Sequence, residues 1–199
     1  HAIGQRLLRA HADQIGLSEG FSVLDRSDAE DLMNLVREEM QFPKSEKRFP
    51  KKGQCLAIYS HAVNARKELG EVLEHFPQYA EWEDELKRLF RGYVAAKQER
   101  DLLDYDDLLL YWATMMADTA VGAEVRRRFD HVLVDEYQDT NVLQAEILTG
   151  LAPTGAGLTV VGDDAQSIYA FRAAEVRNIL EFPQRFDPPA RVVTLEENY

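Results

Sequence analysis

The spacing of apolar residues divides the chain into two halves of different character. In the first hundred residues, apolar positions recur every three or four residues, which is the spacing of one helix face. This pattern predicts helices over residues 1–15, 27–40, 55–76 and 79–103. The large apolar residues of the fourth helix share one face and are predicted to form a core: Trp82, Leu86, Leu89, Phe90 and Tyr93.

Local signals mark the ends of these helices. Gly16 can stop the first helix, and Ser27 with Glu30 matches a capping box for the second. Residues 43–53, PKSEKRFPKKG, contain two prolines, a glycine and five basic residues against one Glu, so they are predicted to form a loop.

The second half alternates short Val- and Leu-rich runs with helical spacing. The runs at Phe129–Val134, Leu158–Val161 and Arg191–Leu195 predict strands, and the segments at 141–151 and 175–182 predict helices. Strands that alternate with helices favour parallel pairing through crossover connections. The fold is therefore expected to be α/β, with a mainly helical first half.

Composition narrows the class of protein. The 199 residues are 45% hydrophobic, enough for one core and a small subdomain, and no apolar run is long enough to span a membrane. The single cysteine, Cys55, permits no internal disulfide, which fits a reducing cytoplasmic setting. The chain starts without Met inside an amphipathic pattern, which indicates a piece of a longer protein.

The net charge of −12 is unevenly distributed. Every lysine lies in the first hundred residues, whereas the second half has only arginines and a clear excess of acids. The acidic total by itself argues against nucleic-acid binding. A net charge does not describe one face, however, and any basic surface is expected in the first half.

Carboxylates follow two of the predicted strands. Asp135 and Glu136 end the apolar run within VLVDEYQDTN, and Asp163 and Asp164 follow Gly162 after the next strand. Ligands of open parallel sheets bind beyond the carboxyl ends of the strands, so these groups are expected to converge if the strands are neighbours. No definite role is assigned to Asp163 or Asp164, which are also compatible with a structural role.

The residue types at these strand ends fit a divided chemical task. Asp135 could hold Mg²⁺ through water, because Mg²⁺ takes few protein carboxylates, and Glu136 could deprotonate an attacking water. Gln138 and Gln166 would supply neutral groups that sense a terminal phosphate. The alternative is that Asp135 and Asp139 cap the following helix and Glu136 is merely solvated; spacing alone does not separate the two interpretations.

Several segments together resemble the UvrD/Rep/PcrA branch of superfamily 1 DNA helicases. VLVDEYQDTN resembles the second helicase motif of that family, VVGDDAQSIYAFRAA the third, and the terminal VVTLEENY the start of the fourth. LLDYDDLLL resembles the segment ahead of the second motif, and HAIGQRLLR resembles the residues just after an early DNA-contacting motif. The segments occur in family order and span essentially the whole chain, which makes the combination specific.

The resemblance implies a nucleotide site that uses ATP and Mg²⁺. Asp135 would coordinate Mg²⁺ through water, and Glu136 would be the general base for ATP hydrolysis. Gln138 would belong to the nucleotide-coupling set, and Gln166 would contact the γ-phosphate and relay its presence to DNA.

The resemblance also implies contacts to single-stranded and duplex DNA. Tyr169 and Phe171 would stack on bases and Arg172 would contact the strand, which is physically apt because every base offers a π-face. His1 would lie near the DNA track. The alternatives are core packing for the two aromatic residues, a local ion pair for Arg172 and a frayed terminus for His1.

The implied fold is an incomplete RecA-like (P-loop NTPase) parallel sheet with an inserted helical subdomain. Residues 1–20 would be a helix of the motor domain, 21–100 the inserted subdomain and 101–199 the remainder of the motor domain. A sheet that lacks the P-loop strand is expected to expose an edge or groove, which would allow the chain to self-associate. The basic loop is a candidate contact for DNA phosphate, with a plain solvated loop as the alternative; its basic residues are Lys44, Lys47, Arg48, Lys51 and Lys52.

Two departures from the family pattern qualify the implied activity. None of the eleven glycines begins a GxxxxGK[ST] motif, and Ala173 stands where the family usually has Gly. The chain is therefore expected to be part of an ATP-dependent helicase, with the activity belonging to the longer parent protein and the 199 residues inactive alone. The alternatives are a non-catalytic DNA-binding or partner-docking module, and the motor part of a recombination-repair helicase–nuclease.

Overall fold

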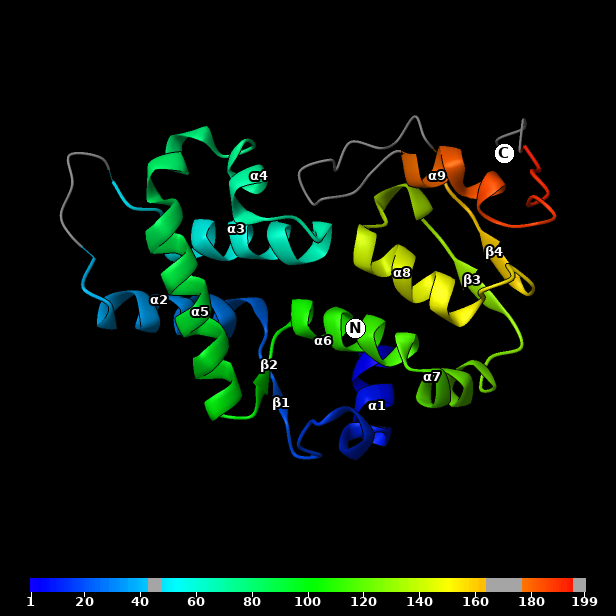
Figure 1. Ribbon diagram of the computed structural model, residues 1–199, viewed down its shortest axis with the longest axis horizontal. Helices are drawn as coiled ribbons and strands as arrows, with labels where there is room; N and C mark the ends of the chain where they lie inside the picture. Colours follow the sequence, from blue (N-terminus) through cyan, green and yellow to red (C-terminus); the bar gives the residue numbers. More distant parts are fainter. Residues whose placement is uncertain (43–47, 164–176, 195–199) are drawn as a thin grey trace. The chain divides into compact units, whose positions relative to one another are not determined.

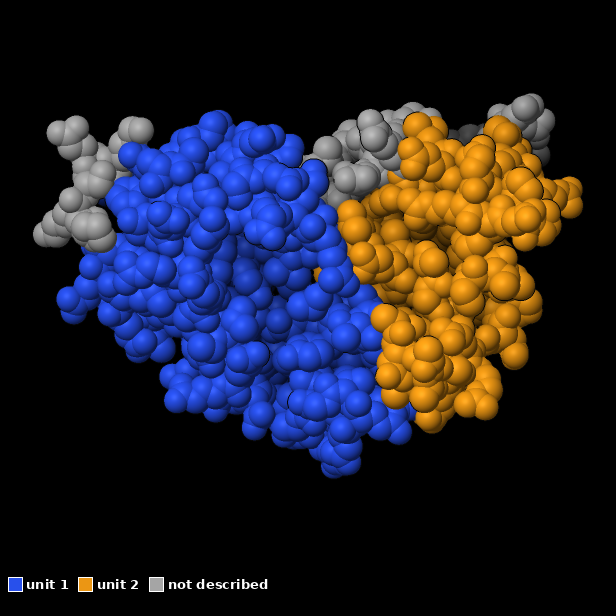
Figure 2. All heavy atoms as spheres, in the orientation of Figure 1, with its two compact units in different colours: residues 1–115 blue, residues 116–199 orange. Residues whose placement is uncertain are grey.

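A computed structural model describes residues 1–42, 48–163 and 177–194 of the protein. The chain divides into two compact units, residues 1–115 and 116–199, which Figure 2 colours separately. The fold is α/β, as the sequence pattern predicted, and the described residues are mostly helical with two small parallel sheets (Figure 1). Among the described residues, no helix is both long and apolar enough to cross a membrane.

Unit 1 is built mainly of helices and contains one parallel strand pair. The predicted helices of the first half are present, but those over 1–15, 55–76 and 79–103 are each divided. The elements are α1 (Ala2–Ala10), η1 (Ala12–Ile15), β1 (Ser22–Val23), α2 (Arg26–Glu39), α3 (Lys52–Ala65), α4 (Leu69–Leu73), η2 (Pro77–Trp82), α5 (Glu83–Glu99), β2 (Leu102–Leu103) and most of α6 (Tyr105–Ala117).

The helix predicted over 55–76 is divided because Arg66 adopts a left-handed conformation, with φ 55° and ψ 39°. A residue in this conformation ends a helix, and the chain restarts as α4. The helix predicted over 79–103 is also too long. It stops at Glu99, and Asp101, with φ 50°, turns the chain into β2. Apolar spacing could not show either break, because the breaks depend on backbone conformation.

The predicted capping box of α2 is wrong. The N-cap is Asp25, whose carboxylate accepts a hydrogen bond from the Asp28 N–H at 2.8 Å, and Ser27 lies inside the first turn. Glu30 instead pairs with Arg26 one turn earlier, at 3.3 Å. Asp and Ser are comparable N-caps, so composition alone does not choose between neighbouring candidates.

The strand pair of unit 1 was not predicted. β1 and β2 run parallel, with Ser22 opposite Leu102 and Val23 opposite Leu103. The pairing is closed by the Ser22 N–H, which donates to the Asp101 carbonyl at 2.9 Å. Two-residue strands are too short to produce a visible alternation of apolar residues, so the sequence carries little signal for them.

The core of unit 1 lies among α2, α3, α4 and α5. The apolar face predicted for the fourth helix is confirmed, because Leu86, Leu89 and Tyr93 of α5 are buried, as is Trp82 at the end of η2, and Phe90 packs against the same cluster. The other buried members of this cluster are Ala29, Met33, Val36, Cys55, Leu56, Ile58, Tyr59, Leu69, Val72 and Leu73.

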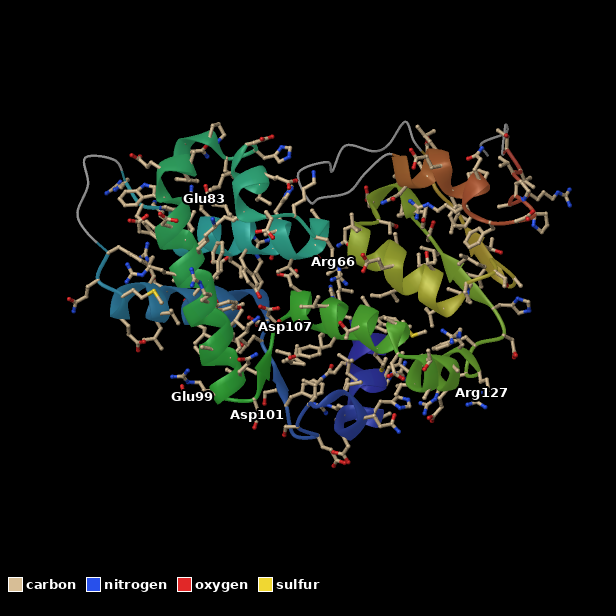
Figure 3. The ribbon with its side chains drawn as sticks, in the orientation of Figure 1. Arg66, Glu83, Glu99, Asp101, Asp107 and Arg127 are labelled. Atoms are coloured by element: carbon tan, nitrogen blue, oxygen red, sulfur yellow. The ribbon has the colours of Figure 1, made fainter. Side chains whose placement is uncertain are left out.

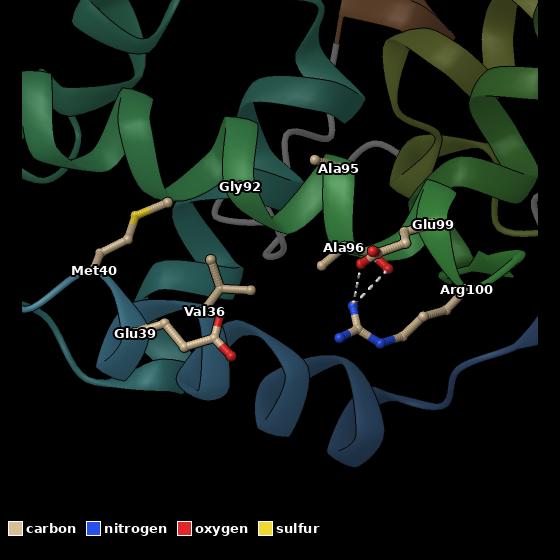
Figure 4. A pocket seen from close by; sticks show the side chains of 8 residues that line it. All are labelled: Val36, Glu39, Met40, Gly92, Ala95, Ala96, Glu99 and Arg100. Atoms are coloured by element: carbon tan, nitrogen blue, oxygen red, sulfur yellow. Dashed lines mark hydrogen bonds and ion pairs between the residues drawn. The ribbon is translucent and has the colours of Figure 1, made fainter.

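Gly92 of α5 lies close to side chains at the C-terminal end of α2. A Cβ at Gly92 would collide with Met40 Cε and lie 2.9 Å from Val36 Cγ1, so these side chains would have to shift to admit a larger residue. A groove runs along this contact, between the two helices, and ends at the Glu99–Arg100 ion pair of 3.5 Å (Figure 4).

Unit 2 contains the predicted strand–helix–strand segment. Its elements are the end of α6, α7 (Thr119–Arg126), β3 (Val132–Val134), η3 (Tyr137–Asp139), α8 (Val142–Leu151), β4 (Leu158–Val160), α9 (Arg177–Glu181) and η6 (Phe182–Arg185). β3 and β4 run parallel, as expected for strands joined through a helix.

The third strand predicted in this half is wrong over the described residues. Arg191–Thr194 have no regular structure, and Leu195 lies outside the described residues. Val192 and Val193 are 68% and 66% exposed. A valine-rich run forms a strand only where a neighbouring strand supplies hydrogen bonds, and the sequence pattern cannot report that neighbour.

Candidate catalytic site

The candidate site forms where β3 and β4 end side by side. Val132 is opposite Leu158, and Val134 is opposite Val160, so the acids after β3 and the glycine after β4 leave the sheet at the same edge. Beyond the ladder, the Tyr137 N–H donates to the Val161 carbonyl at 2.9 Å. The expected convergence of the two strand ends is therefore observed.

Asp135 and Glu136 are both exposed at this edge. The Glu136 N–H donates to Asp135 Oδ1 at 2.9 Å, and Glu136 itself is left-handed, with φ 51° and ψ 43°. A non-glycine residue in this conformation costs on the order of 1 kcal/mol and is retained where surrounding contacts over-determine it. The bend turns the chain sharply from β3 into η3.

Gln138 joins the two strand ends through its side-chain amide. Its Nε2 donates to Glu136 Oε2 at 2.5 Å, and its Oε1 accepts from the Asp163 N–H at 3.0 Å. The side chain is only 2% exposed. Glu136, within VLVDEYQDTN, is thus connected to the backbone of Asp163, within VVGDDAQSIYAFRAA, through the buried amide of Gln138.

Side chains from α9 and η6 hold the segment around η3. Tyr137 is 1% exposed and packs edge-to-face on Phe182, with ring centroids 5.0 Å apart. The Asn178 amide donates to the Thr140 carbonyl at 2.9 Å, and Arg185 donates to Asn178 Oδ1 at 2.6 Å. Burial raises the pKa of the Tyr137 hydroxyl above its usual range. These contacts hold η3 in addition to its hydrogen bond to the end of β4.

The capping alternative for the acids is wrong. α8 is capped by Asn141, whose Oδ1 accepts from the Gln144 N–H at 2.9 Å, while the Gln144 side chain accepts from the Asn141 N–H at 3.0 Å. Asp135 and Asp139 therefore do not cap this helix. Because the cap position is already occupied by Asn141, the acids remain available for another role.

The donor set at this edge fits Mg²⁺ held through water. Among the described residues, no cluster of three or more His, Cys, Asp or Glu side chains could hold a metal by itself. Mg²⁺ keeps several waters and takes one or two carboxylates plus phosphate oxygens, so it does not need such a cluster. The exposed carboxylate of Asp135 fits this mode of binding.

Other predicted site residues are only partly described. His1 is exposed, and its ring stacks on Tyr105 with centroids 4.7 Å apart. In the basic loop, Lys52 forms an ion pair with Asp31 of α2, and Arg48 is exposed. The predicted residues that lie outside the described residues are Lys44, Lys47, Asp164, Gln166, Tyr169, Phe171 and Arg172.

Sequence reasoning missed a buried ionic cluster in unit 1. Lys97 is 2% exposed, and its ammonium donates to Asp104 Oδ2 at 2.6 Å and Asp107 Oδ2 at 2.5 Å. The Tyr93 hydroxyl donates to Asp104 at 2.8 Å, and the Lys97 ammonium lies 4.5 Å from the Tyr93 ring centroid. Figure 3 labels Asp107 at the start of α6. The sequence signal that could have revealed this cluster is Lys97, a lysine among apolar residues of a predicted helix.

The acids of this cluster also begin α6. The Asp104 N–H donates to Asp107 Oδ2 at 3.0 Å, and the Asp107 N–H donates to Asp104 Oδ1 at 2.8 Å, which is the reciprocal pattern of a capping box. Asp106 accepts hydrogen bonds from Ser60 and from Asn64, both on α3. The segment LLDYDDLLL therefore joins three helices of unit 1 by polar contacts.

Comparison with known proteins identifies relatives over the whole chain. Residues 1–187 match the model of the UvrD/REP helicase N-terminal domain. The chain is 34% identical to DNA helicase II of Haemophilus influenzae and 33% identical to ATP-dependent DNA helicase PcrA of Bacillus subtilis, in each case over all of the chain and 26% of the relative. It is 33% identical to DNA helicase II of Escherichia coli, covering 27% of that protein. The chain thus spans about a quarter of the length of these curated relatives.

Proposed function

Because this chain belongs to the UvrD/REP helicase family, we propose that it is part of the first motor domain of an ATP-dependent DNA helicase. The whole protein would unwind duplex DNA from 3′ to 5′ in DNA repair or replication, in the cytoplasm. The observation that supports this best is the convergence of Asp135 and Glu136 with the backbone at Asp163, joined by Gln138.

The proposed architecture is an incomplete RecA-like sheet with a helical insertion. The parallel register of β3 and β4, connected through α8, supports the first part of the proposal. The helical core around α2, α3, α4 and α5 supports an inserted subdomain over about residues 21–100. Leu133 of β3 is 78% exposed. This exposure supports the proposal that another surface packs on the sheet, or that the 199-residue chain self-associates.

In the proposed mechanism, the chain supplies a metal ligand and a base. Mg²⁺ bound through Asp135 would neutralise charge on the phosphates of ATP. The Glu136 carboxylate is exposed to solvent at the sheet edge, and it would accept a proton from the attacking water. Gln166, three residues beyond Asp163, would contact the γ-phosphate.

The proposed DNA contacts combine aromatic stacking with positive charge. Tyr169 and Phe171 would stack on single-stranded bases, and Arg172 would contact the strand. His1 is exposed and stacked on Tyr105, so this ring pair offers an aromatic surface of the same kind. Arg48 and Lys51 are the exposed basic residues of this loop among those described, and they would contact duplex phosphates.

The full-length protein provides the test of this function. We expect ATP hydrolysis that requires Mg²⁺ and rises with single-stranded DNA, together with unwinding of duplexes that carry a 3′ tail. A coupled ATPase assay and a fluorescent strand-displacement assay measure the two activities. DNA binding with no ATP hydrolysis would instead support a non-catalytic module, and a binding titration at increasing salt would report its phosphate contacts.

The 199 residues alone are expected not to turn over ATP. They contain no GxxxxGK[ST], and the backbone of that motif is what cradles the phosphates in this class of enzyme. The measurement is steady-state ATPase activity of the purified 199-residue chain, with the full-length protein as the positive control. Robust Mg²⁺-dependent turnover by the short chain would contradict this proposal.

A further inference from the structure

We infer that Gln138 is a positioning residue that holds the Glu136 carboxylate in place and fixes it to the backbone following β4. The inference rests on the proposed function in one respect, namely that Glu136 is the base for ATP hydrolysis. The geometry on which it stands is the pair of hydrogen bonds from one buried amide to Glu136 and to Asp163.

The two partners of Gln138 have opposite hydrogen-bonding requirements. The ionised Glu136 carboxylate can only accept, and the Asp163 N–H can only donate. A primary amide supplies one donating end and one accepting end, so it satisfies both partners in a single orientation. A glutamate at this position would present two accepting oxygens, and a lysine would present only donors. The two hydrogen bonds therefore favour an amide side chain at position 138.

Burial makes this amide a fixed support. Gln138 is 2% exposed, whereas Glu136 is exposed. A buried amide without hydrogen-bond partners would be destabilising by a few kcal/mol, so its two bonds are strongly favoured in the folded state. An exposed glutamate would otherwise sample several rotamers. The bond from Gln138 Nε2 restricts Glu136 to the orientation in which Oε2 faces the amide.

Gly162 provides independent support, because it leaves room for this amide. A Cβ at Gly162 would lie 2.6 Å from Gln138 Oε1, 2.7 Å from Ile179 Cδ1 and 3.2 Å from the Tyr137 backbone nitrogen. Real contacts of this kind are essentially never as short as the first two, so a larger residue would displace the amide together with the Ile179 side chain, or the strand end. Gly162 is not among the residues of positive φ, so close approach, rather than backbone conformation, is the reason for glycine here.

Positioning matters because proton transfer is sensitive to geometry. A misplacement of about 1 Å can cost on the order of 10²-fold in rate, even when the reacting groups are unchanged. Gln138 does not need to contact ATP in order to affect turnover. Its effect would pass through Glu136, and the two residues should therefore behave as one unit in mutant kinetics.

Two variants of Gln138 in the full-length protein separate its two bonds. Gln138→Met is similar in size and removes both bonds. Gln138→Glu keeps an acceptor for the Asp163 N–H but faces Glu136 with a like charge. We expect kcat for ATP hydrolysis to fall about 10- to 100-fold in both, with the Kd for a fluorescent ATP analogue unchanged within about twofold. Gln98→Met, at an exposed position of α5, is the matched control and should behave as wild type.

A double-mutant cycle distinguishes positioning from general structural damage. In the Glu136→Gln background, Gln138→Met should change the residual kcat by less than about twofold, because the group on which it acts is already lost. A full additional loss would overturn the inference. Wild-type kcat in Gln138→Met alone would also overturn it.

Hydrogen exchange tests the geometry without relying on turnover. The peptide containing Asp163 should lose amide protection in Gln138→Met and keep it in Gln138→Glu, as measured by mass spectrometry on the full-length protein. Unchanged protection in Gln138→Met would overturn the inference. If the wild-type protein shows no ATP hydrolysis, the proposed function fails, and this exchange result still decides whether Gln138 holds the strand end.

Discussion

Replacing Glu136 with glutamine in the full-length protein is expected to lower kcat for ATP hydrolysis by about 10²- to 10⁴-fold, the range typical of a general base. The substitution changes the chemistry of the group but little of its geometry. A glutamine oxygen at position 136 can still accept from Gln138 Nε2, which lies 2.5 Å from Glu136 Oε2 in the native chain. The substitution removes the ability to take a proton from water.

The accompanying binding measurements identify the step that is lost. Affinities for an ATP analogue and for single-stranded DNA should remain within about threefold of wild type, because only the transition state is affected. Glu146→Gln, which removes an exposed carboxylate from α8, is the matched control for charge. Turnover at the wild-type rate in Glu136→Gln would exclude Glu136 as the base.

Replacing Lys97 with methionine is expected to destabilise unit 1 by about 3–5 kcal/mol, the usual cost of removing one partner from a buried ion pair. Methionine keeps most of the side-chain length but leaves Asp104 and Asp107 buried without their shared cation. Both carboxylates are within 2.6 Å of the Lys97 ammonium and are nearly inaccessible to solvent. The Tyr93 ring also loses its cation contact.

Tryptophan fluorescence during urea unfolding measures this effect on unit 1. The chain has two tryptophans, Trp82 and Trp112, and both lie in unit 1. Lys87→Met on the same helix is the matched control, since it breaks an exposed pair with Glu83 and should change the unfolding midpoint little. A similarly small effect of Lys97→Met would show that the buried cluster does not stabilise this unit.

The same cluster predicts a dependence of stability on pH. Burial, followed by the neighbouring charge of Asp104, raises the pKa of Asp107 to about 6. The folded state therefore binds this proton more tightly than the unfolded chain does. The resulting stability is fully present below about pH 4, the unperturbed pKa of Asp, and is lost as the pH rises through about 6. Relative to Asp107→Asn, which cannot ionise, wild type should thus lose stability between about pH 4 and 6 in urea unfolding.

Periodicity predicted the helices well because they bury a continuous face. The apolar stripe of α5 is the clearest case, since Leu86, Leu89 and Tyr93 lie in the core that their spacing indicated. Strands were harder to predict. The run Val132–Val134 became a strand because Leu158–Val160 lies beside it, whereas Arg191–Thr194 did not form one.

The chemistry of the candidate site followed from residue types, but its arrangement did not. Motif order predicts Asp135 and Glu136 as the acids of a nucleotide site, and the family model matches residues 1–187, which include both acids. Gly162 and Asp163 received no role from the sequence. The role of Asp163 depends on the hydrogen bond from its N–H to Gln138, 25 positions away in the chain, and Gly162 leaves room for the same amide. Long-range contacts of this kind are invisible to local patterns.

The sequence by itself determined the family, the α/β class, the core face of α5 and the acids at the end of β3, because these depend on residue type, order and local spacing. Only the tertiary structure decided which partners those residues meet. It paired β3 with β4, enclosed Lys97 between two aspartates, and placed the Gln138 amide between Glu136 and Asp163. Each of these pairings is set by packing between separate segments of the chain, whose free energy is distributed over contacts that no single segment contains.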